Sequence, residues 1–344
     1  MKLSNKRGGY LVKEKRSGKI IVVLMLLFLS SCLCACDSMP DTAAVNRTSS
    51  YQVTDDKGTI VTMIAKPQRI LTLSMSTDEM MLGLVPPEKM VAVNKLLDDP
   101  VSSNIVALAE KIPVKISNPS VEEIAALQPD LVIIQDWGDL EKVASLRELG
   151  INVVVCKGDK SIEEIKETIC LLAQAVNEED KGKTLVAKMD EKMMEIKKKI
   201  DDIPQNQRKK VVLISLMQSY GGSGCIFDDA CHYAGVTNGM AMAGIKSGQT
   251  MSKEQLVKIN PDVLFLPTYN DHGNYDVDTF TKEYLEDPAL QTMAAIKEKN
   301  LQKPREGYIY NGSQDVVFGI QEIAYAVYGK AFSQSNDCHI SAVK

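Results

Sequence analysis

Two stretches of the sequence repeat one pattern: SVEEIAALQPDLVI at residues 120–133 and SKEQLVKINPDVLF at residues 252–265. Each copy begins with a serine that suits a helix N-cap, and Glu123 or Gln255 three residues later completes a capping box. The following apolar residues have helical spacing, and the proline of the Pro-Asp pair ends the helix. Each stretch therefore predicts a short helix followed by a buried strand.

The two copies align without a gap and start 132 residues apart, at residues 120 and 252. This separation is far longer than the roughly 20–50-residue period of solenoid repeats. A chain of about 300 residues with ordinary apolar content can form two domains, each with its own core. We therefore predict an α/β protein with two similar lobes, each built on a largely parallel central sheet.

The predicted first lobe, residues 51–177, alternates strands with helices, as is typical of parallel sheets. We expect a hairpin of strands 51–53 and 59–63, further strands at 69–75, 90–94, 129–135 and 151–156, and helices at 77–84, 140–149 and 161–176. Residues 178–203 are charged and carry an apolar stripe of helical period, so they predict one long helix that joins the lobes.

The predicted second lobe covers residues 204–331. Its expected strands are 210–217, 263–267 and 307–310, followed by a helix at 316–329. The remaining residues, 332–344, include Cys338 and His339 and are expected to form a loosely ordered tail.

The N-terminal region has the pattern of a secretory signal. Residues 1–19 carry seven basic residues against Glu14, and an uncharged apolar run follows at residues 20–29. This run is shorter than the ~20 residues that span a bilayer. It ends in LSSC and LCAC, which resemble the lipobox of bacterial lipoproteins, so Cys32 or Cys36 is the candidate lipid anchor. We expect a signal peptide at 1–31, a flexible tether at 32–50, and an extracytoplasmic protein held at the membrane.

Charge and cysteine content exclude other classes. The net charge is −5, and because residues 1–19 contribute +6, the remainder carries −11. Such an acidic chain is unsuited to nucleic acid, whose phosphates require basic partners. Outside the signal region there are five cysteines without a regular framework. The sequence leaves open whether Cys225 and Cys231 form a disulfide bond.

The strand after Pro67, the two Ser-x-Glu…Pro-Asp stretches and the long central helix resemble the type III substrate-binding proteins of ABC importers. The resemblance covers roughly residues 51–331. It implies a non-enzymatic monomer with no intrinsic cofactor, two lobes bridged by a rigid helix, and a ligand in the cleft between them. The ligands of this family are ferric siderophores, haem and corrinoids, and the partner is a permease dimer with its ATPase.

The same resemblance implies one docking glutamate on each lobe. Matching the family's motif assigns this role to Glu122 and Glu254, which would bind arginines of the permease. Glu123 and Gln255 are engaged in capping, which leaves Glu122 and Glu254 free to point outward. Both glutamates also stabilise the positive end of a helix, and this structural role is compatible with docking.

Candidate ligand-binding residues stand at the expected carboxyl ends of strands, where open α/β sheets bind ligands. They are Met75, Ser76, Trp137, Tyr220, Tyr269 and Asn311. Arginine, the preferred partner of planar anions, is scarce after the lipobox, so a corrinoid, haem or neutral hydroxamate chelate fits better than a catecholate. For haem, Tyr220, Tyr233 and His232 remain alternative axial ligands.

Three alternatives were weighed. A Zn²⁺- or Mn²⁺-binding protein of a related importer class would need several histidines, and the chain has three, with Cys225, Cys231 and His232 lacking zinc-site spacing. A hydrolase is disfavoured because the sequence around Ser223 lacks the last glycine of Gly-x-Ser-x-Gly. A surface adhesion or sensory module would use the same lobes without a permease.

Overall fold

The computed structural model describes residues 50–217, 220–269 and 276–343. Residues 1–47 and 48–344 form separate units. The predicted signal peptide and tether, with Cys32 and Cys36, therefore lie outside the described residues. In the described part, no helix is both long and apolar enough to cross a membrane.

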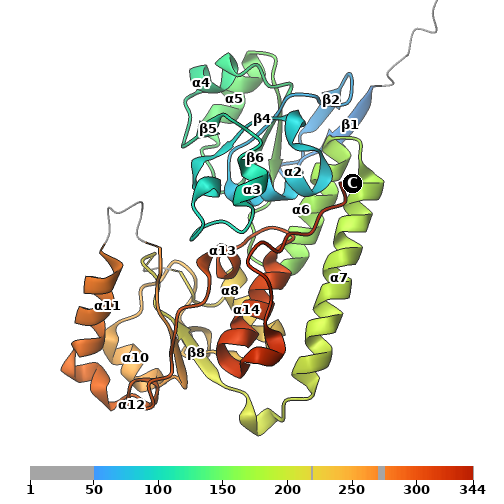
Figure 1. Cartoon of the computed structure of the whole chain (residues 1–344). Coiled ribbons are helices and arrows are strands. Elements are labelled where there is room, and N and C mark those ends of the chain that lie inside the picture. The colour runs from blue at the N-terminus through green and yellow to red at the C-terminus, as the bar shows by residue number, and fades with distance from the viewer. Residues whose placement is uncertain (1–49, 218–219, 270–275, 344) are drawn as a thin grey trace, which may run out of the picture. The chain divides into compact units, whose positions relative to one another are not determined.

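The first lobe contains a parallel sheet with strand order β5-β4-β3-β6-β7 and a separate antiparallel hairpin, β1-β2 (Figure 1). Its strands are β1 Tyr51–Thr54, β2 Ile60–Met63, β3 Ile70–Thr72, β4 Met90–Asn94, β5 Lys115–Ile116, β6 Leu131–Gln135 and β7 Asn152–Cys156. Its helices are α2 Met75–Leu84, α3 Val106–Ala109, α4 Val121–Ala126, α5 Glu141–Glu148 and α6 Ile162–Ala175, with 3-10 turns η1 Pro87–Lys89 and η2 Lys95–Asp98.

The second lobe has its own parallel sheet, in the order β11-β10-β8-β9. Its strands are β8 Lys210–Leu213, β9 Thr237–Asn238, β10 Val263–Phe265 and β11 Leu301–Gln302. Its helices are α8 Ile226–Tyr233, α9 Gly239–Met242, α10 Lys253–Ile259, α11 Val277–Glu286, α12 Ala294–Lys297, α13 Glu306–Ile309 and α14 Val316–Tyr328, with 3-10 turns η3 Gln205–Gln207, η5 Pro288–Thr292 and η6 Lys330–Phe332.

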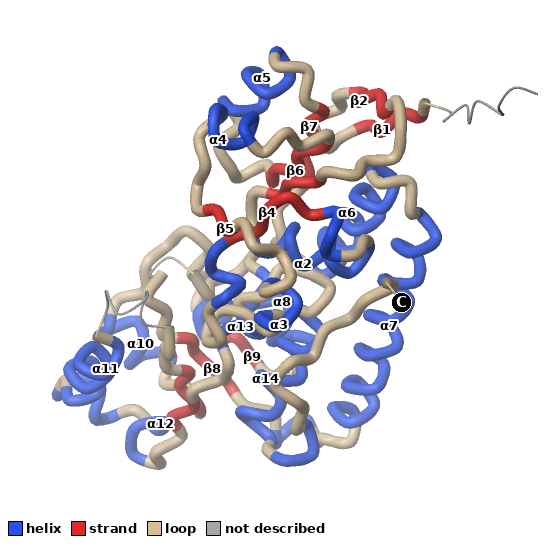
Figure 2. The backbone as a smooth tube through the Cα atoms, turned by 45° about the horizontal axis from the view of Figure 1, so that its top comes forward, coloured by secondary structure: helices blue, strands red, loops and turns tan. Residues whose placement is uncertain are grey.

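Helix α7, Glu179–Asp201, connects the two lobes. Its 23 residues give a length of about 35 Å, and it runs beside both lobes in Figures 1 and 2. It packs on α2 and α6 of the first lobe and on α14 of the second. A single apolar core includes Ile133 of the first sheet, Leu185 and Met189 of α7, and Phe265 of the second sheet. This continuous core favours a rigid connection between the lobes.

The sequence repeat is a repeat of structure. Ser120 and Ser252 are the N-caps of α4 and α10, and both predicted capping boxes are present. Each Pro-Asp aspartate then holds the start of a neighbouring strand: Asp130 accepts hydrogen bonds from the backbone of Gln68 and Arg69, and Asp262 accepts one from the backbone of Lys210.

The side chains of Arg69 and Lys210 complete this correspondence. The Arg69 guanidinium donates to the carbonyls of Leu127 and Gln128 after α4, and the Lys210 ammonium donates to that of Ile259 at the end of α10. Basic side chains near a helix C-terminus satisfy carbonyls that lack a partner within the helix. The two lobes thus anchor the repeated helix by equivalent contacts.

Two expectations about secondary structure were wrong, and the edge strands of the second lobe were not expected. The predicted strand at residues 307–310 is helix α13, in which Gly307 packs so closely on Ser103 that an added Cβ would lie 3.0 Å from its backbone. The edge strands of the second-lobe sheet, β9 and β11, are each only two residues long and so have no readable period. The strand predicted at 69–75 ends at Thr72, because Ser74 caps helix α2 and Met75 already begins it.

The prediction of a loosely ordered tail was also wrong. The segment after Phe332 runs from the second lobe back to the first, where the amide of Ala342 donates to the carbonyl of Gly83 in α2 over 2.9 Å. The Lys188 ammonium of α7 donates to the carbonyl of Ser341 over 2.7 Å, and Ile340 is buried. We name residues 335–343 the C-terminal strap, because they contact both lobes and α7.

Candidate functional site

A cavity of about 310 Å³ lies between the two lobes. Its lining consists of Met75, Ser76, Glu79, Leu96, Ser102, Ser215, Leu216, Met217, Tyr269, Glu306, Gly307, Tyr310, Asn311 and Gly312. Met75, Ser76, Tyr269 and Asn311, which the sequence suggested, therefore meet in one cavity. Such a mainly apolar wall with a few fixed polar groups is typical of small-molecule sites.

The first-lobe wall is the start of helix α2. Ser74 caps this helix, and its hydroxyl also donates to Oε1 of Gln135 at the end of β6 over 2.6 Å. The first turn of α2 carries Ser76, whose Oγ donates to Oδ2 of Asp159 over 3.0 Å. The cap and these two bonds fix the position of α2 at the carboxyl ends of the parallel strands.

Asp159 of the first lobe also lies against the second lobe. A Cβ added to Gly312 of the second lobe would lie 1.5 Å from Oδ2 of Asp159, so a larger residue there would displace the Asp159 side chain. Burial raises the pKa of Asp159, against the hydrogen bond from Ser76. The contact brings a carboxyl group to the rim of the cavity.

The second-lobe wall is held by Tyr310 and Glu306. The Tyr310 hydroxyl donates to Oγ of Ser215 over 2.8 Å, and its ring lies 4.8 Å from the ring of Tyr220. The Glu306 carboxylate accepts from the backbone amides of Thr268 and Tyr269. Glu306 therefore fixes the start of the loop that carries Tyr269 into the cavity.

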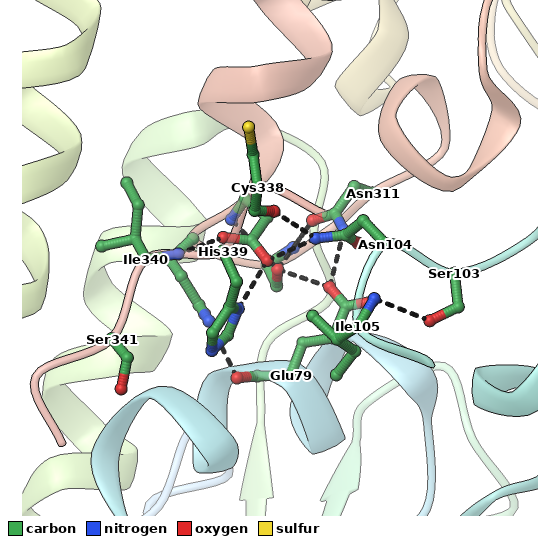
Figure 3. Close-up of polar contacts among 12 residues, drawn as sticks. Glu79, Ser103, Asn104, Ile105, Asn311, Cys338, His339, Ile340 and Ser341 are labelled. Atoms are coloured by element: carbon green, nitrogen blue, oxygen red, sulfur yellow. Dashed lines mark hydrogen bonds and ion pairs between the residues drawn. The ribbon is translucent and has the colours of Figure 1, made fainter. Parts of the chain in front are cut away.

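Behind the cavity, a buried polar network joins the lobes (Figure 3). Oε2 of Glu79, on α2, accepts from Nδ2 of Asn311 and Oγ of Ser313, each over 2.6 Å. Burial and the negative charge of Asp315 raise the pKa of Glu79 to about 8, although its two hydrogen-bond donors lower it. Glu79 thus lines the cavity and ties α2 to the second lobe.

The network continues through Asp315 to the C-terminal strap. The Asp315 carboxylate accepts from Nδ2 of Asn104 over 2.7 Å and from the amide of Ile340 over 2.8 Å, and it pairs with His339. Asn104 donates in addition to the carbonyl of Cys338 (Figure 3). Glu79, Asn104 and the strap were missed by sequence reasoning, because each partner is distant along the chain.

A second cavity of about 320 Å³ adjoins the first, and Ser215 lines both. Tyr220 lines this second cavity instead of the first, with Tyr284 and Phe280 of α11. The Tyr220 hydroxyl is buried without a hydrogen-bond partner. Lys253 also lines this second cavity, and its Nζ is paired with Oδ2 of Asp287 over 2.6 Å.

Trp137 lies outside the lining of both cavities. Its side chain follows β6, is 61% exposed, and packs against Gly158, next to the rim residue Asp159. His232 and Tyr233, the alternative haem ligands, end helix α8 and also line neither cavity. The role of these residues in ligand binding stays a prediction.

Glu122 and Glu254 are exposed on the first turns of α4 and α10. Hydrogen bonds within these first turns lower the pKa of both carboxyl groups, so both are ionised at neutral pH. Helices α4 and α10 belong to different lobes and lie on the side away from α7 (Figures 1 and 2). The two carboxylates are therefore accessible to a partner.

The cysteines of the described residues carry free thiols. Cys225 and Cys231, for which a bridge was left open, are both buried and unbridged, and Cys231 lies within α8. Among the described residues, no three His, Cys, Asp or Glu side chains are grouped so that they could hold a metal ion.

Two α/β lobes, a bridging helix and an interlobe cavity define a two-lobed binding protein. The family model described as periplasmic binding protein matches residues 70–303, and the chain belongs to this family. It is the substrate-binding component of an ABC importer and not an enzyme. Members of the family act outside the cytoplasm.

Individual relatives are distant. The chain is 24% identical over 320 residues to the Fe(3+)-citrate-binding protein YfmC of Bacillus subtilis, covering 87% of this chain and 91% of the relative. It is 25% identical to the probable siderophore-binding lipoprotein YfiY of the same organism, covering 83% and 90%. The solved apo structure of the periplasmic heme-binding protein RhuT from Roseiflexus sp. RS-1 has a TM-score of 0.65 at 22% identity, covering 76% and 98%. This structural likeness shows the common fold.

Proposed function

We propose that this protein is a lipid-anchored, extracytoplasmic binding protein that captures a metal chelate between its lobes and delivers it to an ABC permease. The cavity carries this proposal, because its lining is contributed by both lobes and combines apolar side chains with fixed polar groups. The relatives named for ferric citrate and siderophores support the ligand class. The lipobox cysteines, together with a relative named a lipoprotein, support the anchor.

The fold supports a mechanism of capture and docking. Ligand enters between α2 and the segment from Glu306 to Gly312, and the core shared with α7 limits closure to a small movement. Glu122 and Glu254, one on each lobe, then bind the two permease subunits. ATP hydrolysis by the importer drives release.

The test is a ligand screen on residues 45–344, which contain the compact unit that begins at residue 48. Thermal shift and Trp137 fluorescence are followed with cobalamin, haem, ferric citrate and ferric hydroxamates. We expect saturable, submicromolar binding of one chelate, with a stabilisation of about 2.7 kcal/mol at one hundred times Kd. A response to Zn²⁺ or Mn²⁺ alone would move the protein to the metal-ion class, and no response would favour a surface or sensory module.

A further inference from the structure

Besides two tyrosines, the ionisable side chains that line the interlobe cavity, in the described part of the chain, are the carboxylic acids Glu79 and Glu306. A third carboxyl group, that of Asp159, stands at the rim, where it contacts Ser76 and Gly312 of the lining. The described residues of the lining thus offer acidic groups and no lysine, arginine or histidine to a bound ligand.

Hydrogen bonds fix all three carboxyl groups in place. Asn311 and Ser313 hold Glu79, backbone amides of Thr268 and Tyr269 hold Glu306, and Ser76 holds Asp159. Within the described residues, no lysine or arginine forms an ion pair with any of them. Two basic groups from the second lobe have other partners: Arg305 pairs with Glu322, and Lys253 pairs with Asp287.

The inference rests on the proposed function, in which the cavity binds a metal chelate. We infer that the cavity selects cationic chelates over anionic ones and that Glu79 sets this preference. Glu79 lines the cavity from α2 and is only 2% exposed. Burial raises its pKa to about 8, so a cation bound beside it would favour release of its proton, and little water would screen the resulting carboxylate charge. The cost of ionising Glu79 and the distance to the ligand charge reduce the attraction, so we expect affinity to change about tenfold for each unit of ligand charge. Ferric citrate is anionic, so the inference separates this chain from the relative named for that chelate.

The surroundings of Glu79 agree with this role. Asp315 before α14 and His339 of the strap act on Glu79 electrostatically, and Glu306 of α13 lines the same cavity. His339 is already paired with Asp315. A ligand cation would therefore be the counter-charge that Glu79 lacks, and an anion would add to the negative charge.

The experiment varies ligand charge on a constant scaffold. A ferric linear trihydroxamate is used with its terminal amine free (charge +1), acetylated (neutral) or succinylated (−1). Calorimetry on residues 45–344 at pH 9, where the Glu79 carboxyl group is largely ionised, is expected to give the order cation, neutral, anion, with about tenfold between steps. The total spread is the ratio of the affinity for the cation to the affinity for the anion. In Glu79→Gln, whose amide oxygen can still accept from Asn311 and Ser313, this spread should fall below about threefold.

Controls separate charge selection from damage to the fold. Glu163→Gln changes an exposed carboxylate on α6 and should keep the full spread. Asp159→Asn should reduce the spread by a smaller factor, and thermal unfolding checks that each variant is folded. Equal or tighter binding of the anion by the wild type would overturn the inference, and a full spread in Glu79→Gln would remove Glu79 from it.

A second scaffold distinguishes this inference from the proposed function. Cobalamin is compared with axial water (cationic), with axial cyanide (neutral) and as its cyanide-bound monocarboxylate (anionic). Failure of both scaffolds and of haem to bind would overturn the proposed function and the inference with it. Binding of either scaffold without the charge order would overturn the inference alone.

Discussion

Nδ1 of His339 lies 2.7 Å from Oδ2 of Asp315, so the C-terminal strap forms a buried ion pair with the second lobe. The Asp315 side chain is fully buried and that of His339 is 14% exposed. Burial lowers the pKa of His339, but the neighbouring Asp315 carboxylate raises it above its ordinary value overall. The pair stands where the strap, the first lobe and α14 meet.

We expect His339→Ala to lower the free energy of unfolding by about 3 kcal/mol, because it leaves the Asp315 carboxylate buried without its cation. Asn104 and the Ile340 amide still donate to Asp315, which places the loss at the lower end for buried pairs. Denaturant unfolding measures it. The matched control, His232→Ala, changes an exposed histidine and should stay within about 0.5 kcal/mol of the wild type. Equal losses in both variants would contradict a structural role for the strap.

The buried Glu79 predicts that stability depends on pH. Its pKa is about 8 in the folded protein and 4.5 when unfolded, so the folded state binds more protons between these values. Stability from this group is therefore complete below about pH 4.5 and is lost as pH rises towards 8. The raised pKa of His339 acts in the same direction, and Asp78, whose burial raises its pKa to about 8, does so as well.

Glu79→Gln isolates this contribution. We expect the variant to gain stability relative to the wild type as pH rises from 5 to 8, by at most about 1.4 kcal/mol per pH unit. Unfolding free energies at pH 5, 6.5 and 8 measure the difference. A constant difference between the two proteins would mean that Glu79 titrates normally.

The sequence predicted the features of the fold that depend on neighbouring residues. Both capping boxes, at Ser120 and Ser252, are local patterns with a direct physical meaning, and their repetition indicated two lobes. The central helix was predicted at residues 178–203 and found at 179–201, since its apolar stripe has a strong helical period. These elements positioned four of the suggested ligand residues in one cavity.

The rest depends on contacts between distant residues. Glu79 has the spacing of an ordinary buried helix position, and only its hydrogen bond to Asn311, 232 residues away, shows that it lies between the two lobes. The strap is polar and lacks a period, so nothing local distinguishes it from a loose tail. Trp137 was suggested by its aromatic ring at a strand end, but that position does not determine whether the ring turns into the cavity.

Tyr310 should contribute more to ligand binding than Trp137. Tyr310→Ala removes a lining ring that stacks on Tyr220, and we expect at least about a tenfold loss of affinity. Tyr310→Phe removes only the hydrogen bond to Ser215, so the loss should stay below about fivefold. Trp137→Ala should weaken binding by less than about threefold, since exposed side chains outside a buried centre contribute little. Calorimetry measures all three, and a larger effect of Trp137 would extend the site beyond the cavity.

The lipid anchor can be assigned to one of two cysteines. Diacylation requires the thiol of the first mature residue, so labelled palmitate should be incorporated into the wild type and lost in one of Cys32→Ala and Cys36→Ala. We expect the loss in Cys32→Ala, because Cys32 directly follows the apolar run. Labelling that persists in both single variants and in the double variant would exclude the anchor.

Docking should depend on Glu122 and Glu254 without affecting ligand affinity. Both carboxylates are exposed on separate lobes, and neither lines the cavity. We expect Glu122→Ala with Glu254→Ala to reduce import at least about tenfold, because loss of two charge pairs with the permease removes several kcal/mol of association, while Kd changes less than twofold.

The matched control for docking is Glu141→Ala with Glu163→Ala. These glutamates also lie in the first turns of helices, so they reproduce the effect on helix stability without altering α4 or α10. Import into cells and ligand calorimetry are measured for both double variants. Normal import by the Glu122 and Glu254 variant would exclude these residues from docking. A large loss of ligand affinity in it would show that the two helices act on the cavity, whereas unchanged affinity with lost import separates presentation from capture.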